Sequence, residues 1–261
     1  MIRLKTEREI EKIKESSLIV GQTLAEVAKL ISPGVKTVTL DKVAEEFIRD
    51  NAGVPSFKGY RGFPASLCIS VNDVVVHGVP SQNELKDGDI VAVDCGVKKN
   101  GFHADYAYTF FVGNVPEIIR NFCERTKQAL YAGISKAQAG NRVGDVSFEI
   151  QSYVEKFGYS VVREMIGHGI GKNLHEKPDV PNHGNKGNGA KIKKGMVFCI
   201  EPMINFGSKE IRTDKDGWTT RTKDGLPSAH YEHMVAIRDN GTEILSTYEF
   251  IEEVLNLKNE R

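Results

Sequence analysis

Apolar residues at helical spacing predict a long helix at the start of the chain. Thr6, with Glu9 three residues later, forms a capping-box signature, and Pro33-Gly34 marks the end of the helix. The apolar stripe consists of Ile10, Ile13, Ile19, Leu24, Val27 and Leu30. A second, shorter helix is expected to begin after Thr39 and to end at Gly53. The N-terminal segment therefore predicts two amphipathic helices.

The same order of elements occurs a second time. A long helix is predicted from Pro116 to Gly140, and a shorter one near 146–156. Strands follow the helices in both parts, at 66–71 and 74–77 in the first and at 161–165 and 196–204 in the second. Long helix, short helix and strands thus repeat in order, which indicates an internal repeat.

Residues 90–111 alternate apolar and polar positions and predict a β-hairpin turning at Asn100-Gly101. If the loop is Lys98–Gly101, Asp94 lies directly opposite Asp105. Side chains alternate along a strand, so both carboxylates share one face while the other face is apolar. Two like charges at this spacing repel each other unless a proton or a cation lies between them. The hairpin alone leaves open whether this face binds a cation or is simply solvated.

The repeat places a carboxylate at the same point of each half. Gly88 precedes Asp94 by six residues, and Gly195 precedes Glu201 by six residues. Unrelated surface acids would not explain these equal offsets. Each half also has a glycine-flanked histidine upstream and a second acid downstream. These are His77 and Asp105 in the first half, and His168 and Glu232 in the second.

Folding the two halves about a pseudo-two-fold axis would bring four carboxylates and at least one histidine together. Repulsion would destabilise such a cluster in the absence of a cation. Carboxylate oxygens with a single imidazole suit Mn, Fe, Co or Zn, whereas a closed structural zinc site prefers thiolate and imidazole. The sequence therefore predicts a site for two divalent ions.

Composition excludes several other classes of function. The 261 residues include 35 basic and 35 acidic side chains, so net charge gives no basis for nucleic acid or an anionic membrane as the main partner. Cys95 and Cys199 lie in apolar strand patterns, which favours buried free thiols in a reducing compartment. The N-terminal segment lacks the apolar region of a signal peptide, and no apolar run has the length of a membrane span. We therefore expect a cytoplasmic protein.

Six motifs together resemble the type I methionine aminopeptidases, a metallopeptidase family related to prolidase and creatinase. The motifs are ISVNDVVVHGVP, VAVDCG, GFHADYAYTF, MIGHGIGKNLHEKP, CIEPMI and YEHM. The resemblance implies an α+β pita-bread fold, in which two pseudo-symmetric α/β halves share a central curved antiparallel sheet with helices on its outer face. It implies a single catalytic domain over 1–261, with halves of approximately 6–112 and 115–254. The implied reaction is removal of the N-terminal methionine from nascent proteins whose second residue is small.

The resemblance also implies roles for individual residues. The metal ligands would be Asp94, Asp105, His168, Glu201 and Glu232, which would bind two divalent ions (Co, Mn, Fe or Zn). His77 and His175 would contact the substrate, and Glu201 would act as the general base. A monovalent cation is expected near Asn72, Val74 and Ser228. The expected partners are nascent polypeptide N-termini with a transient ribosome contact, and the protein is expected to be a monomer without membrane or specific nucleic-acid partners.

Recognition of methionine requires an apolar pocket, because aromatic rings and sulfur make favourable contacts with a thioether. The candidates are Tyr60, Phe63, Cys68 and Trp218, together with Phe57 and Met203. Ordinary core packing is the alternative for each of them. Of the two histidines that flank Glu232, His230 shares its position in a strand alternation and His233 does not. His230 is therefore the better candidate for a contact with the ligands.

Two other functions fit the same pattern. A prolidase-like dipeptidase would share the five ligands, although such enzymes usually carry a large N-terminal domain. A non-catalytic binding module on the same fold would typically lack ligands, and all five are present here. Comparing the cleavage of X-Pro peptides with that of Met-Ala peptides distinguishes a dipeptidase from a methionine aminopeptidase. Metal analysis of the protein distinguishes a binding module from an enzyme.

Overall fold

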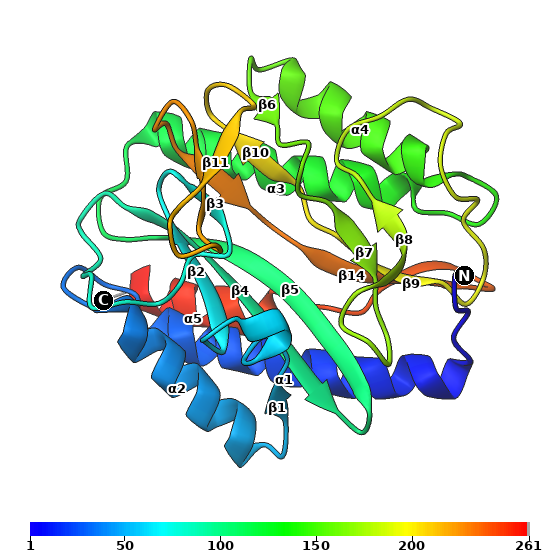
Figure 1. Ribbon diagram of the computed structural model, residues 1–261, viewed down its shortest axis with the longest axis horizontal. Helices are drawn as coiled ribbons and strands as arrows, with labels where there is room; N and C mark the ends of the chain where they lie inside the picture. The colour runs from blue at the N-terminus through cyan, green and yellow to red at the C-terminus, as the bar shows by residue number, and fades with distance from the viewer. Residues whose placement is uncertain (260–261) are drawn as a thin grey trace.

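Helices flank the strands on two sides in this computed structural model, which describes residues 1–259 (Figure 1). The helices are α1 (Glu7–Leu30), α2 (Thr37–Asp50), α3 (Glu117–Lys136), α4 (Val143–Glu155) and α5 (Glu249–Asn259), with a short 3-10 turn η1 (Tyr60–Gly62). Helices α1, α2 and α5 lie together at the bottom of Figure 1, and α3 and α4 lie at the top. The α+β class predicted from the sequence is confirmed.

The strands between the helices form four sheets, and every pairing among the described residues is antiparallel. The strands are β1 (Val54–Pro55), β2 (Leu67–Val71), β3 (Val74–Val76), β4 (Ile90–Lys99), β5 (Phe102–Phe111), β6 (Ser160–Val161), β7 (Gly167–Gly169), β8 (Glu176–Val180), β9 (Val197–Ile200), β10 (Met203–Asn205), β11 (Ile211–Thr213), β12 (Thr220–Thr222), β13 (Ser228–His230), β14 (His233–Arg238) and β15 (Gly241–Ile244). The orders are β1-β4-β2 with β5 on β4, β13-β10-β6, β11-β12-β3, and β15-β14-β9-β7-β8.

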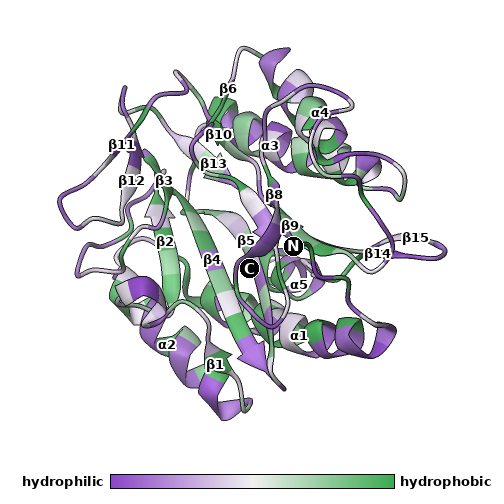
Figure 2. Ribbon diagram, turned by 45° about the vertical axis from the view of Figure 1, so that its right-hand side comes forward, coloured by the Kyte–Doolittle hydropathy of each residue, from purple (hydrophilic) through white to green (hydrophobic). Residues whose placement is uncertain are grey.

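Helix α1 has the predicted cap and the predicted apolar face. The Glu9 amide donates to the Thr6 hydroxyl at 3.3 Å, and the Thr6 amide donates to the Glu9 carboxylate at 3.0 Å. The buried face of α1 packs against β4 and β5, and Figure 2 shows hydrophobic stretches alternating with hydrophilic ones along this helix. Helix α2 begins at Thr37 rather than after Thr39, and the Thr37 hydroxyl hydrogen-bonds to Ser81. Helix α1 therefore covers one side of the hairpin of β4 and β5.

The hairpin has a shorter turn than the sequence analysis predicts. Strands β4 and β5 are joined by Asn100 and Gly101 alone, with φ values of 50° and 81°. Positive φ at both central residues defines a type I′ turn, whose twist matches that of the flanking strands. The prediction that Asp94 lies directly opposite Asp105 is therefore wrong: Asp94 pairs with Ala107, and Asp105 pairs with Gly96. Because the shift is two residues, the two carboxylates still share one face.

The strands of the second half are shorter than predicted. In place of the strand expected at 161–165 there is only the two-residue strand β6, Ser160–Val161. The strand expected at 196–204 is split into β9 and β10. Pro202 lies in the break, and proline has no amide hydrogen to donate to a ladder. Glu201 therefore lies at the end of β9 in irregular backbone. Gly88 and Gly195, six residues before the two repeated acids, both have positive φ (92° and 81°), so the same turn precedes both strands.

The cysteines agree with their predicted environment, since all four are buried and free. Within residues 1–259, no helix has both the length and the apolar character needed to cross a bilayer.

Candidate metal centre

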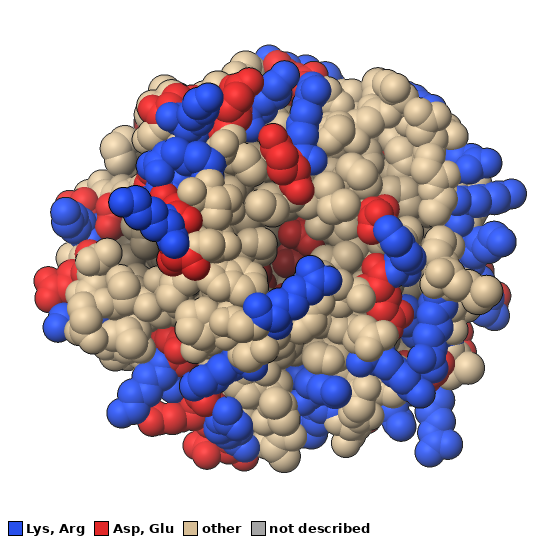
Figure 3. All heavy atoms as spheres, in the orientation of Figure 1, with Lys and Arg blue, Asp and Glu red and all other residues tan. Residues whose placement is uncertain are grey.

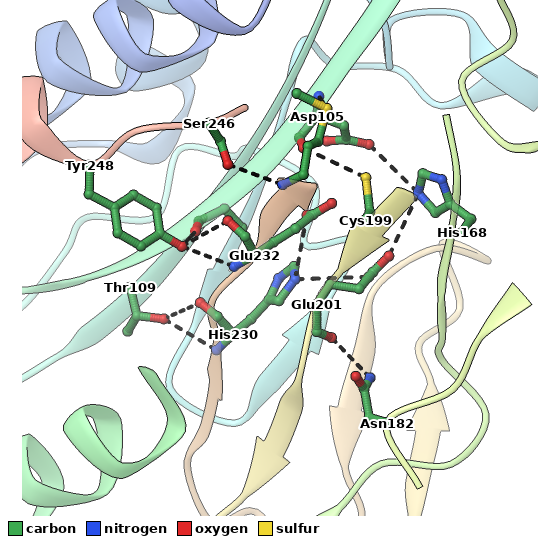
Figure 4. Close-up of polar contacts among 12 residues, drawn as sticks. Asp105, Thr109, His168, Asn182, Cys199, Glu201, His230, Glu232, Ser246 and Tyr248 are labelled. Atoms are coloured by element: carbon green, nitrogen blue, oxygen red, sulfur yellow. Dashed lines mark hydrogen bonds and ion pairs between the residues drawn. The ribbon is translucent and has the colours of Figure 1, made fainter. Parts of the chain in front are cut away.

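Five side chains from distant parts of the chain meet at one point between the two helix layers. Asp94 comes from β4, Asp105 from β5 and His168 from β7, while Glu201 follows β9 and Glu232 lies between β13 and β14. The Nε2 atom of His168 is 3.6 Å from a Glu201 carboxylate oxygen and 3.9 Å from an Asp105 carboxylate oxygen (Figure 4). Oxygens of Asp94, Asp105 and Glu232 lie within 4.8 Å of one another. The structure thus brings together all five residues proposed as metal ligands.

The carboxylates of this cluster lack the hydrogen bonds that buried oxygens normally make. Within the described chain, Oδ1 of Asp94, Oδ1 of Asp105 and Oε1 of Glu232 are buried without a partner. Asp105 and Glu232 are only 4% and 2% exposed. A buried polar atom without a partner costs about 1–3 kcal/mol, and more if it is charged. These orphaned oxygens indicate that a cation belongs among them.

Burial and mutual repulsion both act on the acidic groups. Burial raises the pKa of Asp94 to about 6. Burial also raises the pKa of Asp105 well above its usual range, and the neighbouring carboxylates of Asp94 and Glu232 raise it further. The pKa values of Glu201 and Glu232 are raised by the same two causes. Four carboxylates can therefore be ionised together at neutral pH only when cations neutralise them.

The histidine of the cluster is in the form that binds metals. Burial lowers the pKa of His168 to about 4, so its imidazole is neutral at neutral pH. Its Nδ1 atom is 3.0 Å from the carbonyl oxygen of Gly169, and an Nδ1–H donated there leaves the Nε2 lone pair facing the acids. Oxygen donors with a neutral imidazole fit divalent ions of the Mn, Fe, Co and Zn group.

A cavity of about 510 Å³ opens above the cluster. Figure 3 shows the corresponding hollow, with acidic atoms at its floor. All of the residues proposed for the methionine pocket and for substrate contacts line this cavity, namely Phe57, Tyr60, Phe63, Cys68, His77, His175, Met203 and Trp218. The sequence-predicted substrate residues therefore share one space with the acidic cluster.

One wall of the cavity is aromatic. The rings of Phe63 and Trp218 meet edge to face with centroids 5.2 Å apart, and the Trp218 ring lies 6.4 Å from that of His77. Cys68 pairs with Asp94 across the β2–β4 ladder, and burial raises the pKa of its thiol, which keeps the sulfur uncharged. This wall offers rings and sulfur directly beside the cluster, which suits an apolar side chain.

His175 is oriented by Tyr60. Its Nδ1 atom lies 2.8 Å from the Tyr60 hydroxyl, and its ring centroid is 4.1 Å from that of His168. Burial and the neighbouring His168 lower the pKa of His175 to about 3, so it is neutral. With Nδ1 accepting from the Tyr60 hydroxyl, the proton of His175 lies on Nε2 and is free to be donated.

His77 has a strained backbone. Its φ of 57° lies in the left-handed region, which residues other than glycine rarely adopt. The following Gly78 admits no side chain, because a β carbon there would lie 2.1 Å from the carbonyl oxygen of Ile69. Strain of this kind is typical of functional positions, where surrounding contacts hold a side chain in place.

A buried ion pair anchors the segment that carries His175. The Lys5 ammonium is 2.9 Å from the Glu176 carboxylate, with side chains only 2% and 6% exposed. The other carboxylate oxygen of Glu176 accepts from the Asn173 amide at 3.0 Å. We expect Lys5→Met to destabilise the protein by about 3–5 kcal/mol, because it leaves a buried charge unpaired. Urea unfolding measures this, and the Lys5→Met/Glu176→Gln double variant should recover part of the loss; equal loss in both variants would contradict the role of the pair.

Two other residues at the cluster, Asn182 and Tyr248, carried little or no signal in the sequence, whereas a third, His230, was indicated by its position in the strand alternation. Asn182 donates to the carbonyl oxygen of Glu201 at 3.0 Å, although it lies in a segment with the composition of a flexible loop. The Tyr248 hydroxyl accepts from the Glu232 amide at 3.1 Å. His230 is buried, and burial lowers its pKa to about 3. Its Nε2 atom faces Glu201 and Glu232, whereas His233 bonds to Ser246.

Comparison with known proteins places the chain in a family. Residues 11–239 match the sequence model of metallopeptidase family M24. A methionine aminopeptidase of Clostridium perfringens is 53% identical over 94% of this chain and 99% of its own length. The crystal structure of methionine aminopeptidase from Thermotoga maritima has a TM-score of 0.93 at 42% identity and covers 95% of this chain and 100% of that one. Prolidase from Pyrococcus furiosus, at 23% identity and a TM-score of 0.78, covers 94% of this chain and 65% of that one, and it shares the fold.

These matches confirm the pita-bread fold implied by the sequence motifs. The chain therefore belongs to metallopeptidase family M24, and within it to the methionine aminopeptidases.

Proposed function

We propose that this chain removes the N-terminal methionine from polypeptides whose second residue is small. The observation that carries the proposal is the cluster of buried, unsatisfied carboxylates with one neutral imidazole at the floor of a cavity with an apolar wall. The methionine aminopeptidase of Clostridium perfringens, 53% identical to this chain, supports the assignment.

Two divalent ions of the group Co, Mn, Fe and Zn would be held by Asp94, Asp105, His168, Glu201 and Glu232. When bound, such ions lower the pKa of water, which supplies a nucleophile at neutral pH, and they polarise the scissile carbonyl. The ligand residues contribute by being fixed on five different strands or strand ends before any substrate arrives.

Three residues would handle protons and hydrogen bonds during cleavage. Glu201 would take a proton from the attacking water and pass it to the leaving amine. His175, with Nε2–H available, would donate to the oxygen of the scissile carbonyl as negative charge develops there. His77 would hydrogen-bond the scissile amide nitrogen. Phe63, Trp218 and Cys68 would hold the methionine side chain against the aromatic wall.

A peptide panel tests this function against the prolidase alternative. With Mn²⁺ added, we expect release of free methionine from Met-Ala-Ser, and little product from Leu-Ala-Ser or Ala-Pro, because the proposed apolar wall suits an unbranched thioether side chain. Chromatography of the products measures each rate. Met-Trp-Ser serves as the control for a large second residue and should be cleaved slowly. Turnover of Ala-Pro alone would contradict the proposal.

We also propose a monovalent-cation site and a cellular setting. A monovalent cation would bind near Asn72, Val74 and Ser228, where the Ser228 amide donates to the Asn72 carbonyl oxygen at 2.9 Å. The protein would act as a monomer in the cytoplasm. Its substrates would be the N-termini of nascent polypeptides, which it would reach through a transient contact with the ribosome. The zero net charge gives no support for a membrane or a specific nucleic acid as partner.

A further inference from the structure

His230 lies at the metal centre but is not one of the five proposed ligands. The residue is only 2% exposed, and its Nε2 atom has no hydrogen-bond partner anywhere in residues 1–259. Its backbone is held on both sides by Thr109, whose hydroxyl donates to the His230 carbonyl at 2.6 Å and accepts from its amide at 3.2 Å. A buried imidazole nitrogen that is held in place without a hydrogen-bond partner indicates that another group, such as a metal ion, binds it.

The two carboxylates nearest to this nitrogen are both proposed metal ligands. Nε2 of His230 is 3.9 Å from Oε2 of Glu201 and 3.8 Å from Oε2 of Glu232 (Figure 4). These separations exceed those of hydrogen bonds. Two donor atoms that each lie about 2.1 Å from one ion are about 3.0 Å apart at a right angle and about 4.2 Å apart when opposite. Both distances therefore fit donor atoms that share an ion.

His168 stands in the same relation to the other side of the cluster. Its Nε2 atom is 3.6 Å from Oε1 of Glu201 and 3.9 Å from Oδ2 of Asp105. Each oxygen of Glu201 thus faces one imidazole, as Figure 4 shows. The donor atoms of Glu201, His230 and Glu232 also lie within 4.8 Å of one another, as a metal site requires.

We propose that His230 is a sixth ligand of the metal centre and binds one of the two ions through Nε2, on the side of Glu232. The ligand set would then be four carboxylates and two imidazoles, one imidazole for each ion. Imidazole suits Zn and Fe, whereas carboxylate oxygens suit Mn. His230 should therefore strengthen Zn²⁺ binding more than Mn²⁺ binding. The inference rests on the proposed metal centre, but its tests need no peptide turnover.

The ligand can be counted in the intact protein loaded with Co²⁺. Imidazoles that bind Co²⁺ give strongly shifted, solvent-exchangeable N–H signals in the ¹H NMR spectrum. We expect two such signals from the wild-type protein, from His168 and His230, and one from His230→Gln. The matched control is His233→Gln, since His233 flanks Glu232 on the other side and bonds to Ser246 instead; it should keep both signals. A single signal in the wild-type protein would overturn the proposal whether or not the variants fold.

Metal affinities give an independent reading. In competition with a chromophoric chelator, His230→Gln should bind Zn²⁺ about 10–100-fold more weakly than the wild-type protein does, with a smaller loss for Mn²⁺. An unchanged Zn²⁺ affinity in the folded variant would refute the sixth ligand. Two shifted signals in a protein that cleaves no peptide would instead support this inference and contradict the proposed peptidase function, so the two failures are distinguishable.

Discussion

Replacing Glu201 with glutamine is expected to lower kcat/KM for a Met-Ala peptide by at least about 10²–10⁴-fold, the range for loss of a general base. Glutamine has nearly the same shape, so the break between β9 and β10 and the hydrogen bond from Asn182 to the Glu201 carbonyl should persist. The amide cannot take a proton from water and binds divalent ions poorly. Both the proton transfer and the metal centre are therefore impaired by a single atom change.

The matched control is Glu243→Gln. Glu243 is a carboxylate that pairs with Lys14 and Arg238, outside the cavity. This variant should keep its turnover, and steady-state release of methionine measures both proteins. Turnover of Glu201→Gln within about threefold of wild type would rule out Glu201 as the base.

Removal of metal should abolish turnover and make stability depend on pH. In the metal-free protein, burial raises the pKa of Asp94 to about 6 from an ordinary value near 4, and the pKa values of Asp105, Glu201 and Glu232 are raised as well. An acid whose pKa is raised by folding stabilises the folded state only while it remains protonated. The unfolding free energy of the metal-free protein should therefore fall as pH rises from about 4 through about 6 and beyond.

Thermal unfolding of chelator-treated protein from pH 5 to 8, with and without Mn²⁺, measures this effect. Bound ions take the place of the protons, so Mn²⁺ should raise Tm most at the upper end of this range. A free Mn²⁺ concentration of 100 times the Kd of a site adds about 2.7 kcal/mol to the free energy of unfolding. Mg²⁺ at the same ionic strength is the control for screening. A Tm that is independent of Mn²⁺ at pH 7.5 would show that the carboxylates do not need a cation.

The repeated glycine-to-acid spacing correctly predicted that acids of the two halves lie together, because strand periodicity and a turn before each strand fix where a side chain points. Gly88 and Gly195 adopt the same positive φ, and Asp94 and Glu201 lie at matching positions beyond them. The hairpin register was predicted wrongly because Asn-Gly permits loops of different length. The prediction that both carboxylates lie on one face of the hairpin was nevertheless correct, since a shift by two residues preserves the alternation of side chains.

Contacts between distant segments could not be predicted in this way. Lys5 and Glu176 are 171 residues apart, and nothing local indicates that their charges are buried together. Asn182 has loop composition, yet it supports the backbone of Glu201. The parity that separated His230 from His233 was a correct guide to which one faces the acids, but the distances to Glu201 and Glu232 required the fold. The division into two halves of one catalytic domain stays a prediction.

Anomalous diffraction from crystals grown with Mn²⁺ tests the central claim most directly. Data collected above and below the manganese absorption edge locate Mn²⁺ independently of any assumed chemistry. We expect two anomalous peaks at the floor of the cavity, among Asp94, Asp105, His168, Glu201 and Glu232. The absence of any peak within coordination distance of these residues, in crystals of protein that binds Mn²⁺ in solution, would contradict the account.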